Sequence, residues 1–244
     1  CLALGAWASA AETLRIGADQ WMPFNGEAQA ERPGYVVELL RKIYAAEGVS
    51  VDYRVVPWAD ALGQAARGEL DAVIGANLTE AARLRVPQEE VGAPRVALWV
   101  HKSNRWRYTD LRSLLQVRVG VIAEYKYWDS FDEFVIKQPT LKLVKFSGET
   151  PLRDALGKML AGELDVMPET LPVFAWNVKA AGLAVSDFTM AYLHTAEPIY
   201  VAFSPAHPRI ETLVKTWDAG VRKLRASGEL AQLLQKYGLR DWRD

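Results

Sequence analysis

Two stretches of this chain are nearly the same phrase: ALGQAARGELDAV at residues 61–73 and ALGKMLAGELDVM at residues 155–167. In each stretch apolar residues recur at helical spacing, a glycine then ends the helix, and a short apolar strand follows. A helix that leads through a turn into a buried strand is a packing unit of α/β folds. Its occurrence in both halves of a 244-residue chain predicts two similar α/β lobes.

Strand and helix patterns alternate through the first half. Apolar residues recur with helical spacing from residue 36 to residue 43, and Gly48 follows where such a helix would end. The predicted order is strand, helix, strand, helix, strand, which implies a mainly parallel sheet covered by helices. The strands are expected at residues 14–17, 49–55 and 70–75, and the helices at residues 36–43 and 58–67.

The second half repeats this order. Pro151 precedes one of its helices, in a position suited to a first helical turn. The carboxyl ends of the strands are of special interest, because ligands of open α/β sheets bind there. The strands are expected at residues 118–122, 141–146 and 164–167, and the helices at residues 128–136 and 152–160.

Three further segments complete the chain. Two extended stretches, residues 96–102 and 197–203, stand where the chain would pass between the two halves. The closing segment, residues 210–237, is predicted to form two amphipathic helices separated at Ser227 and Gly228.

Composition places the chain among globular proteins. Half of its residues are apolar, 24% are charged and the formal net charge is −1. This charge argues against a nucleic-acid partner, and no apolar run approaches the roughly 20 residues that a membrane span needs. Nine Trp residues are a high count, and Trp lines clefts as well as cores because its ring has a wide stacking face and one N–H donor.

The first residues resemble part of a secretion signal. Residues 1–11 are small and apolar and contain the sequence Ala8-Ser9-Ala10, which has the form of a signal-peptidase site. We therefore expect residues 1–11 to be the end of a signal peptide. Cys1 is the only cysteine, so the processed chain would contain no disulfide, and its stability must come from core burial.

Five segments, in this order and spacing, are similar to those of one known family. They are WMPF at residues 21–24, PGYVVELLRKIYAAEGVSVDYRVVPWADALGQAARGELDAVIG at 33–75, DLRSLLQVRVGV at 110–121, GELDVMPETLPV at 162–173 and LRASGELAQLLQKYGL at 224–239. Through them the chain resembles the periplasmic extracellular solute-binding proteins of the polar amino-acid type, family 3 of the ABC importers. The resemblance covers nearly all of the chain after residue 11.

The resemblance implies an α/β fold of the two-lobed periplasmic binding proteins, type II-like, with two crossover hinge strands and a cleft that closes on a ligand. Lobe one is expected at residues 12–98 and 198–244, and lobe two at residues 99–197. The implied function is the capture of a small polar or amino-acid-like solute for the permease of an ABC importer in the inner membrane. The protein is expected to be a periplasmic monomer without a cofactor or a nucleic-acid partner.

Ligand contacts in lobe one are implied for loops that follow two strands. An aromatic side chain of the first loop covers the ligand in the family, and Trp21 or Phe24 matches that place. Backbone carbonyls and a hydroxyl follow the GELD strand, where this chain has Gly75, Asn77 and Thr79.

An arginine that grips the ligand's α-carboxylate is also implied, three residues after Thr79. That position holds Ala82, and the arginine comes one residue later, at Arg83. One residue on a helix is about 100° of rotation. Arg83 therefore either reaches the ligand through a reshaped loop or lies on the surface.

Lobe two departs further from the family's pattern. Small residues are common after its first strand, where a helix N-terminus receives the carboxylate, and this chain has the bulky Tyr125, Tyr127 and Trp128. The acid that pairs with an α-ammonium matches Thr170, while Glu169 comes one residue earlier. These departures favour a ligand with a large flat or aliphatic part.

An aromatic clamp follows from the positions of three residues. Trp21 and Trp58 follow strands of lobe one and Tyr125 follows the first strand of lobe two, so they should face one another across the cleft. Stacking adds roughly 0.5–1.5 kcal/mol beyond area burial. The competing interpretation is that the two Trp residues are core.

Two other functions are alternatives to the capture of a solute. His101, His194 and His207 have no metal-ligand spacing, so no metal site is expected. One alternative is a periplasmic dehydratase of cyclohexadienyl acids such as prephenate or arogenate, with Glu169 as general acid. Another is a ligand-sensing module of a membrane receptor. We expect a stand-alone binder instead, because the chain ends at Asp244 without a membrane span.

Overall fold

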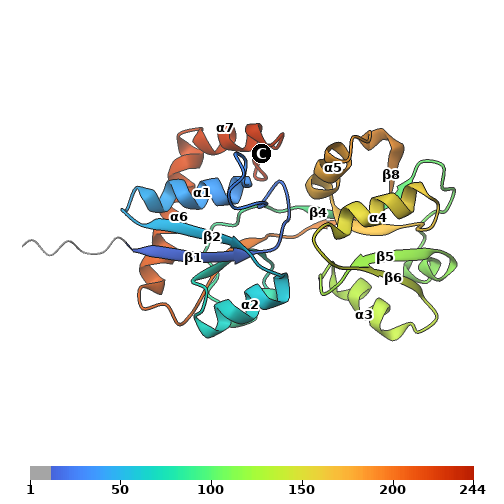
Figure 1. The fold of residues 1–244 in the computed structure, drawn as a ribbon, viewed down its shortest axis with the longest axis horizontal. Coiled ribbons are helices and arrows are strands. Elements are labelled where there is room, and N and C mark those ends of the chain that lie inside the picture. Colours follow the sequence, from blue (N-terminus) through green and yellow to red (C-terminus); the bar gives the residue numbers. More distant parts are fainter. Residues whose placement is uncertain (1–11) are drawn as a thin grey trace, which may run out of the picture.

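The computed structural model describes residues 12–244, and the predicted end of a signal peptide lies outside the described residues. Two α/β lobes lie side by side along the longest axis of the molecule (Figure 1). Extended segments of the chain cross between them. The two-lobed α/β architecture predicted from the repeated phrase is therefore confirmed.

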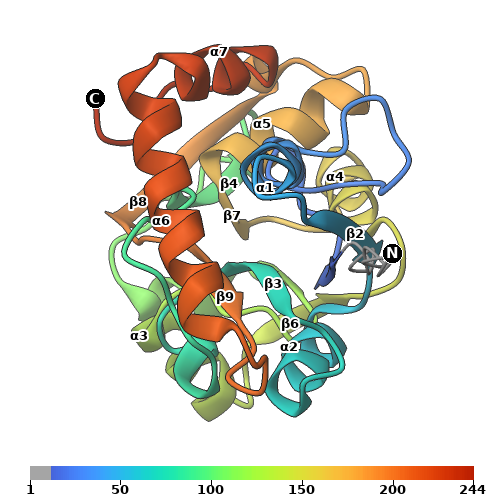
Figure 2. The same ribbon diagram turned by 90° about the vertical axis from the view of Figure 1, so that its left-hand side faces the viewer.

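Lobe one is built on a four-stranded sheet in the order β2-β1-β3-β9. β1 pairs in parallel with both of its neighbours, and β9 runs antiparallel to β3. Figures 1 and 2 show α1 and α2 on opposite faces of this sheet. The strands are β1 (Thr13–Ala18), β2 (Ser50–Val55), β3 (Ala72–Ala76) and β9 (Tyr200–Phe203), and the helices are α1 (Tyr35–Ala45), α2 (Trp58–Arg67), α6 (Ile210–Ala226) and α7 (Glu229–Lys236).

The core of lobe one lies between the sheet and its helices. α1 buries an apolar face, and α6 packs beside it with Trp217 fully buried. The hydroxyl of Tyr44 on α1 donates to the backbone oxygen of Leu213 on α6 at 2.9 Å. The two closing helices predicted for residues 210–237 are present, and Gly228, whose φ is 79°, separates them.

Lobe two combines a parallel pair of strands with an antiparallel sheet. β5 and β6 are parallel, whereas β4 is antiparallel to both β7 and β8, and a bridge between Val119 and Val166 links the two parts. The strands are β4 (Arg95–His101), β5 (Arg118–Ile122), β6 (Lys142–Phe146), β7 (Met167–Thr170) and β8 (Phe188–Ala196), and the helices are α3 (Asp129–Lys137), α4 (Pro151–Leu160) and α5 (Leu171–Ala180). Sequence analysis did not predict β8.

The two crossing segments run antiparallel to each other. Gly92 pairs with Ile199, and the Ile199 N–H donates to the Gly92 oxygen at 2.9 Å. β4 is already part of the lobe-two sheet at Arg95, which pairs with Ala196. The first crossing therefore lies at about residues 92–95, slightly before the expected boundary at residue 98.

The aspartate of each GELD phrase makes the same contacts in its lobe. Asp71 accepts hydrogen bonds from the backbone N–H of Arg15 at 2.7 Å and from its guanidinium at 2.7 and 3.1 Å. Asp165 accepts the same set from Arg118 at 2.8, 2.8 and 2.7 Å. The pair joins the turn after the repeated helix to β1 in lobe one and to β5 in lobe two.

Candidate ligand-binding site

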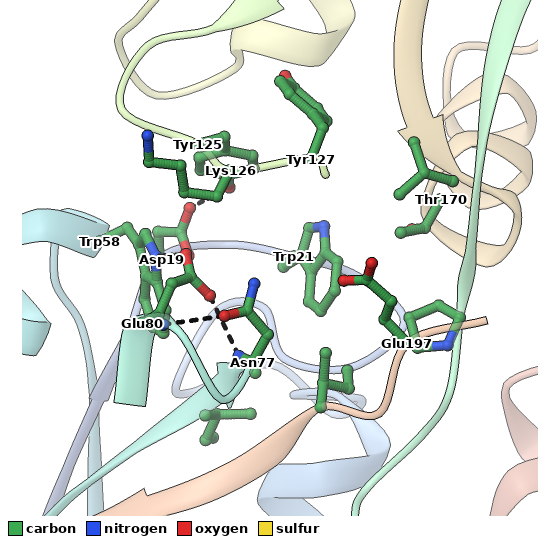
Figure 3. Close-up of a pocket in the computed structure, with 15 residues that line it drawn as sticks. Asp19, Trp21, Trp58, Asn77, Glu80, Tyr125, Lys126, Tyr127, Thr170 and Glu197 are labelled. Atoms are coloured by element: carbon green, nitrogen blue, oxygen red, sulfur yellow. Dashed lines mark hydrogen bonds between the residues drawn. The ribbon is translucent and has the colours of Figure 1, made fainter. Parts of the chain in front are cut away.

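A cleft between the two lobes is lined by residues from both (Figure 3). It leaves about 600 Å³ of space, its open mouth included. The carboxyl ends of β1, β3 and β5 lead into loops that contribute to it, as expected for α/β sheets. The lining residues are Asp19, Trp21, Trp58, Ile74, Gly75, Asn77, Glu80, Pro94, Val96, Tyr125, Lys126, Tyr127, Thr170, Glu197 and Ile199.

One hydrogen bond joins the lobes directly across this cleft. The hydroxyl of Tyr125, in the loop after β5, donates to the carboxylate of Asp19, which directly follows β1 (Figure 3). Burial raises the pKa of Asp19, and the bond from Tyr125 opposes that rise. Burial also raises the pKa of Tyr125, so this hydroxyl remains a donor at neutral pH.

Glu80 connects two walls of the cleft in lobe one. Its carboxylate accepts from the indole N–H of Trp58 at 2.8 Å and from the backbone N–H of Asn77 at 3.1 Å. The Asn77 side chain in turn accepts from the Glu80 N–H at 2.9 Å, which completes a reciprocal capping box. Burial raises the pKa of Glu80, since these bonds only partly compensate for lost water.

Glu169 is buried behind Thr170, at the lobe-two side of the cleft. Its carboxylate accepts from the backbone N–H and hydroxyl of Thr170 at 2.6 and 3.1 Å. Burial nevertheless raises its pKa to about 7. The indole N–H of Trp21 lies near enough to favour the ionised carboxylate, yet this buried donor has no hydrogen-bond partner within residues 12–244.

Trp21 and Phe24 occupy different environments although both belong to the first loop. Their rings are stacked, with centroids 4.4 Å apart. Phe24 is only 2% exposed and belongs to the core, whereas half-buried Trp21 lines the cleft. Gly75 fits against Trp21 because its φ is 95° and a Cβ there would lie 3.3 Å from the indole.

The structure brings together most of the residues that sequence analysis proposed for the site. Glu169 lies directly behind the cleft wall, and Thr79 is exposed at the outer mouth. Phe24 is behind Trp21, and Arg83 is exposed and not among the lining residues. The predicted residues that line the cleft are Trp21, Trp58, Gly75, Asn77, Tyr125, Tyr127 and Thr170.

The position of Arg83 follows from the shape of its loop. Residues Glu80–Arg83 form a short 3-10 turn, and Ala81 is the residue that this turn buries. Glu80, at the start of the turn, is directed into the cleft by its bonds to Trp58 and Asn77. Arg83 comes at the end of the turn and is directed to solvent.

Four charged residues of the lining were absent from the sequence-based prediction. Asp19 directly follows β1, Lys126 lies in the loop after β5, and Glu197 is in the second crossing segment. Glu80 could have been predicted from the sequence, because Asn77 and Glu80 have the spacing of a capping box.

Within residues 12–244, no group of three His, Cys, Asp or Glu residues is arranged to hold a metal ion, and no helix has the length and apolarity to cross a membrane.

Solved structures with this fold belong to several kinds of protein. An amino acid ABC transporter substrate-binding protein, AbpA from Streptococcus pneumoniae, bound to L-arginine, is 19% identical with a TM-score of 0.71, covering 92% of this chain and 94% of that one. The ancestral amino acid-binding protein AncCDT-1, a precursor of cyclohexadienyl dehydratase, is 21% identical with a TM-score of 0.72, covering 92% and 95%. A histidine kinase sensor domain with similarity to periplasmic binding proteins is 20% identical with a TM-score of 0.71, also covering 92% and 95%. These identities show a shared fold.

The sequence matches a model of a protein family, although it matches no individual curated protein. A search of curated proteins finds no match. A family model does match, over residues 14–240, which is nearly the whole of the described chain. Together with the two lobes and the cleft between them, this match shows that the chain belongs to the bacterial extracellular solute-binding proteins, family 3.

Proposed function

We propose that this protein captures a small polar or amino-acid-like solute in the interlobe cleft and presents it to the permease of an ABC importer at the inner membrane. The observation that carries the proposal is a cleft whose walls come from both lobes and whose lobes are joined by the bond from Tyr125 to Asp19. The location is periplasmic, in keeping with a family of extracellular solute-binding proteins.

The geometry supports capture by closure of the cleft. The lobes are connected by two antiparallel crossing segments, at Gly92 and Ile199, that can act as hinges. A ligand that contacts Trp21 and Trp58 on one side and Tyr125 and Tyr127 on the other would stabilise the closed state over the open state. The permease would then recognise the closed form, and no chemical step is required.

Glu169 supports a second candidate, a dehydratase that acts on a cyclohexadienyl acid such as prephenate or arogenate. Its raised pKa, about 7, suits a general acid, and its bonds to Thr170 hold it at the cleft wall. The charge of the cleft argues against this candidate. Prephenate carries two carboxylates, and Asp19, Glu80 and Glu197 would repel them.

The test is a panel of solutes added to chain lacking residues 1–11. Native mass spectrometry should show one solute bound per chain, and the same solute should raise the melting temperature. A solute at 100 times its dissociation constant adds about 2.7 kcal/mol to the free energy of unfolding. A panel of amino acids, amines and sugars in which nothing binds would overturn the proposal.

The enzyme candidate has its own test with the same protein. Prephenate and arogenate are incubated with the wild type and with Glu169→Gln, and aromatic products are followed by absorbance. We expect no turnover in either protein. Turnover that is lost in Glu169→Gln would establish the dehydratase instead.

A further inference from the structure

The interlobe cleft carries an excess of negative charge. Three carboxylates line it, those of Asp19, Glu80 and Glu197, and Lys126 is the one basic residue among its lining residues. A fourth carboxylate, that of Glu169, lies directly behind Thr170. A ligand in this cleft is therefore surrounded by more acids than bases.

Two buried carboxylates outside the cleft are paired with arginine. Asp71 meets Arg15 at 2.7 Å, and Glu89 meets Arg225 at 3.0 Å. Asp19, Glu80 and Glu169 make no such ion pair within the described residues, although burial desolvates all three. A buried charge without a counter-charge is costly, because lost hydration is not replaced. A cationic ligand in the cleft would therefore supply the counter-charge that these carboxylates lack.

The basic groups that would bind a carboxylate on the ligand are missing or directed elsewhere, and the indole N–H of Trp21 is a neutral donor that cannot supply a counter-charge. Arg83 is exposed outside the cleft, and the backbone N–H of Asn77 already donates to Glu80 at 3.1 Å. Lys126 is exposed, and its charge partly opposes the rise in pKa that burial causes at Glu80 and Asp132. In Figure 3 its ammonium points away from Trp21 and the centre of the pocket. A carboxylate in the cleft would meet like charges instead of partners.

The aromatic walls complement a cation as well. Trp21, Trp58, Tyr125 and Tyr127 line the same space as the carboxylates. A cation held against an aromatic face gains roughly 0.5–2 kcal/mol. The bond from the indole N–H of Trp58 to Glu80 at 2.8 Å fixes one such ring beside one such carboxylate.

We propose that the cleft selects an organic cation that carries no carboxylate, such as an aliphatic amine, over the corresponding α-amino acid. The inference rests on the proposed function, since it concerns the same cleft, and it narrows the class of solute. The ammonium or guanidinium would lie among Asp19, Glu80 and Glu197, with the alkyl part against the aromatic rings.

Agmatine and L-arginine form the decisive pair, because they share the guanidinium and the alkyl chain and differ only in the α-carboxylate. Titration calorimetry at pH 7.5 should show that agmatine binds at least tenfold more tightly than L-arginine. Putrescine and L-ornithine provide a second pair with the same difference. If the amino acid binds as tightly as its amine in both pairs, the inference is wrong while the proposed capture of a solute stands.

Three variants locate the effect within the cleft. Glu80→Gln has nearly the same shape and keeps one of the two acceptor oxygens, but it removes the charge, so agmatine binding should weaken at least tenfold. Lys126→Met should leave agmatine binding unchanged or tighten it, because it removes the competing positive charge. Glu47→Gln, on the exposed surface of lobe one, is the matched control and should change nothing.

The sign of the Lys126→Met effect separates the two ligand classes. Weaker binding of an acidic or zwitterionic solute in this variant would identify Lys126 as a carboxylate partner and overturn the inference. Melting temperatures of all three variants show that each is folded. If agmatine and putrescine fail to bind while an amino acid binds, only the inference fails; if no solute of the panel binds, both it and the proposed function fail.

Discussion

The hydroxyl of Tyr125 donates to the carboxylate of Asp19, and these two residues belong to different lobes. Asp19 follows β1 and Tyr125 follows β5, the strands that open the two repeated strand–helix units, so the bond links equivalent positions of the two halves across the cleft. A hydrogen bond to a charged acceptor contributes roughly 1.5–3 kcal/mol. This bond alone is therefore enough to shift the balance between open and closed forms by an order of magnitude or more.

Tyr125→Phe should shift the ligand-free protein toward the open form. The substitution removes the hydroxyl and keeps the ring, so contacts other than the bond to Asp19 are retained. Small-angle scattering should show a larger radius of gyration than for the wild type, with the difference reduced when a bound solute closes the cleft. Tyr108→Phe, in lobe two and away from the lining residues, is the control. An unchanged radius of gyration in Tyr125→Phe would show that the bond does not hold the lobes together.

Glu169 makes the stability of the protein dependent on pH. Burial raises its pKa from the ordinary 4.5 to about 7 in the folded chain, so the folded state favours the neutral acid. The contribution of Glu169 to the stability of the folded state is fully present below about pH 4.5. It is lost as the pH rises to about 7, because the unfolded chain releases this proton at a lower pH than the folded chain. Asp19 and Glu80, whose pKa values are also raised by burial, act in the same direction.

Urea melts between pH 4.5 and pH 8 should therefore give a free energy of unfolding that falls with pH. The contribution of Glu169 is on the order of 3 kcal/mol, and Glu169→Gln should reduce the slope accordingly. Glu47→Gln, exposed and remote, should reproduce the wild-type slope. Parallel slopes for wild type and Glu169→Gln would mean that this carboxyl titrates normally.

The repeated phrase made the fold predictable. Residues 58–67 were expected to form a helix and do so, since Gly68 adopts a φ of 80° that ends it. β8 was missed because Phe188 is its only buried residue, so the strand lacks the apolar alternation that marks a half-buried strand. Local pattern thus predicts elements that bury a regular face, and fails where pairing to a neighbour decides the conformation.

The site was predictable in position and only partly in chemistry. Trp21, Trp58 and Tyr125 reach the cleft because each follows a strand whose end faces it. Arg83 and Glu80 belong to one turn, and which of them enters the cleft depends on the 3-10 geometry and on the bond to Trp58. Such a choice is made by contacts distant in sequence, and spacing alone does not reveal it.

Asp71 should be a major support of lobe one. The residue is 4% exposed, and its carboxylate accepts from both the backbone and the guanidinium of Arg15. Asp71→Ala leaves these donors without their acceptor, which should cost about 2 kcal/mol or more of the free energy of unfolding. Glu69 forms an exposed pair with Arg67 nearby, and Glu69→Ala should produce no measurable change. Urea melts of the two variants side by side test the contrast; equal losses would contradict it.

Trp21 and Phe24 distinguish ligand binding from folding most clearly. Their rings stack on each other, but Trp21 lines the cleft and Phe24 belongs to the core. Trp21→Ala removes a wall of the cleft, so the tightest solute of the panel should bind at least tenfold more weakly, a loss of about 1.4 kcal/mol. Phe24→Ala leaves a cavity in the core, since this ring is 2% exposed, and should cost about 3 kcal/mol or more of the free energy of unfolding.

Calorimetry and urea melts on both variants give a two-by-two comparison. Trp21→Ala should lose affinity with the smaller loss of stability, because its half-buried ring leaves space that water from the cleft can fill. Phe24→Ala should mainly lose stability. Its affinity should fall only because Trp21 no longer stacks on the Phe24 ring. If Trp21→Ala instead destabilises the fold as much as Phe24→Ala and leaves affinity intact, Trp21 is a core residue and the aromatic wall of the cleft is formed by Trp58, Tyr125 and Tyr127 alone.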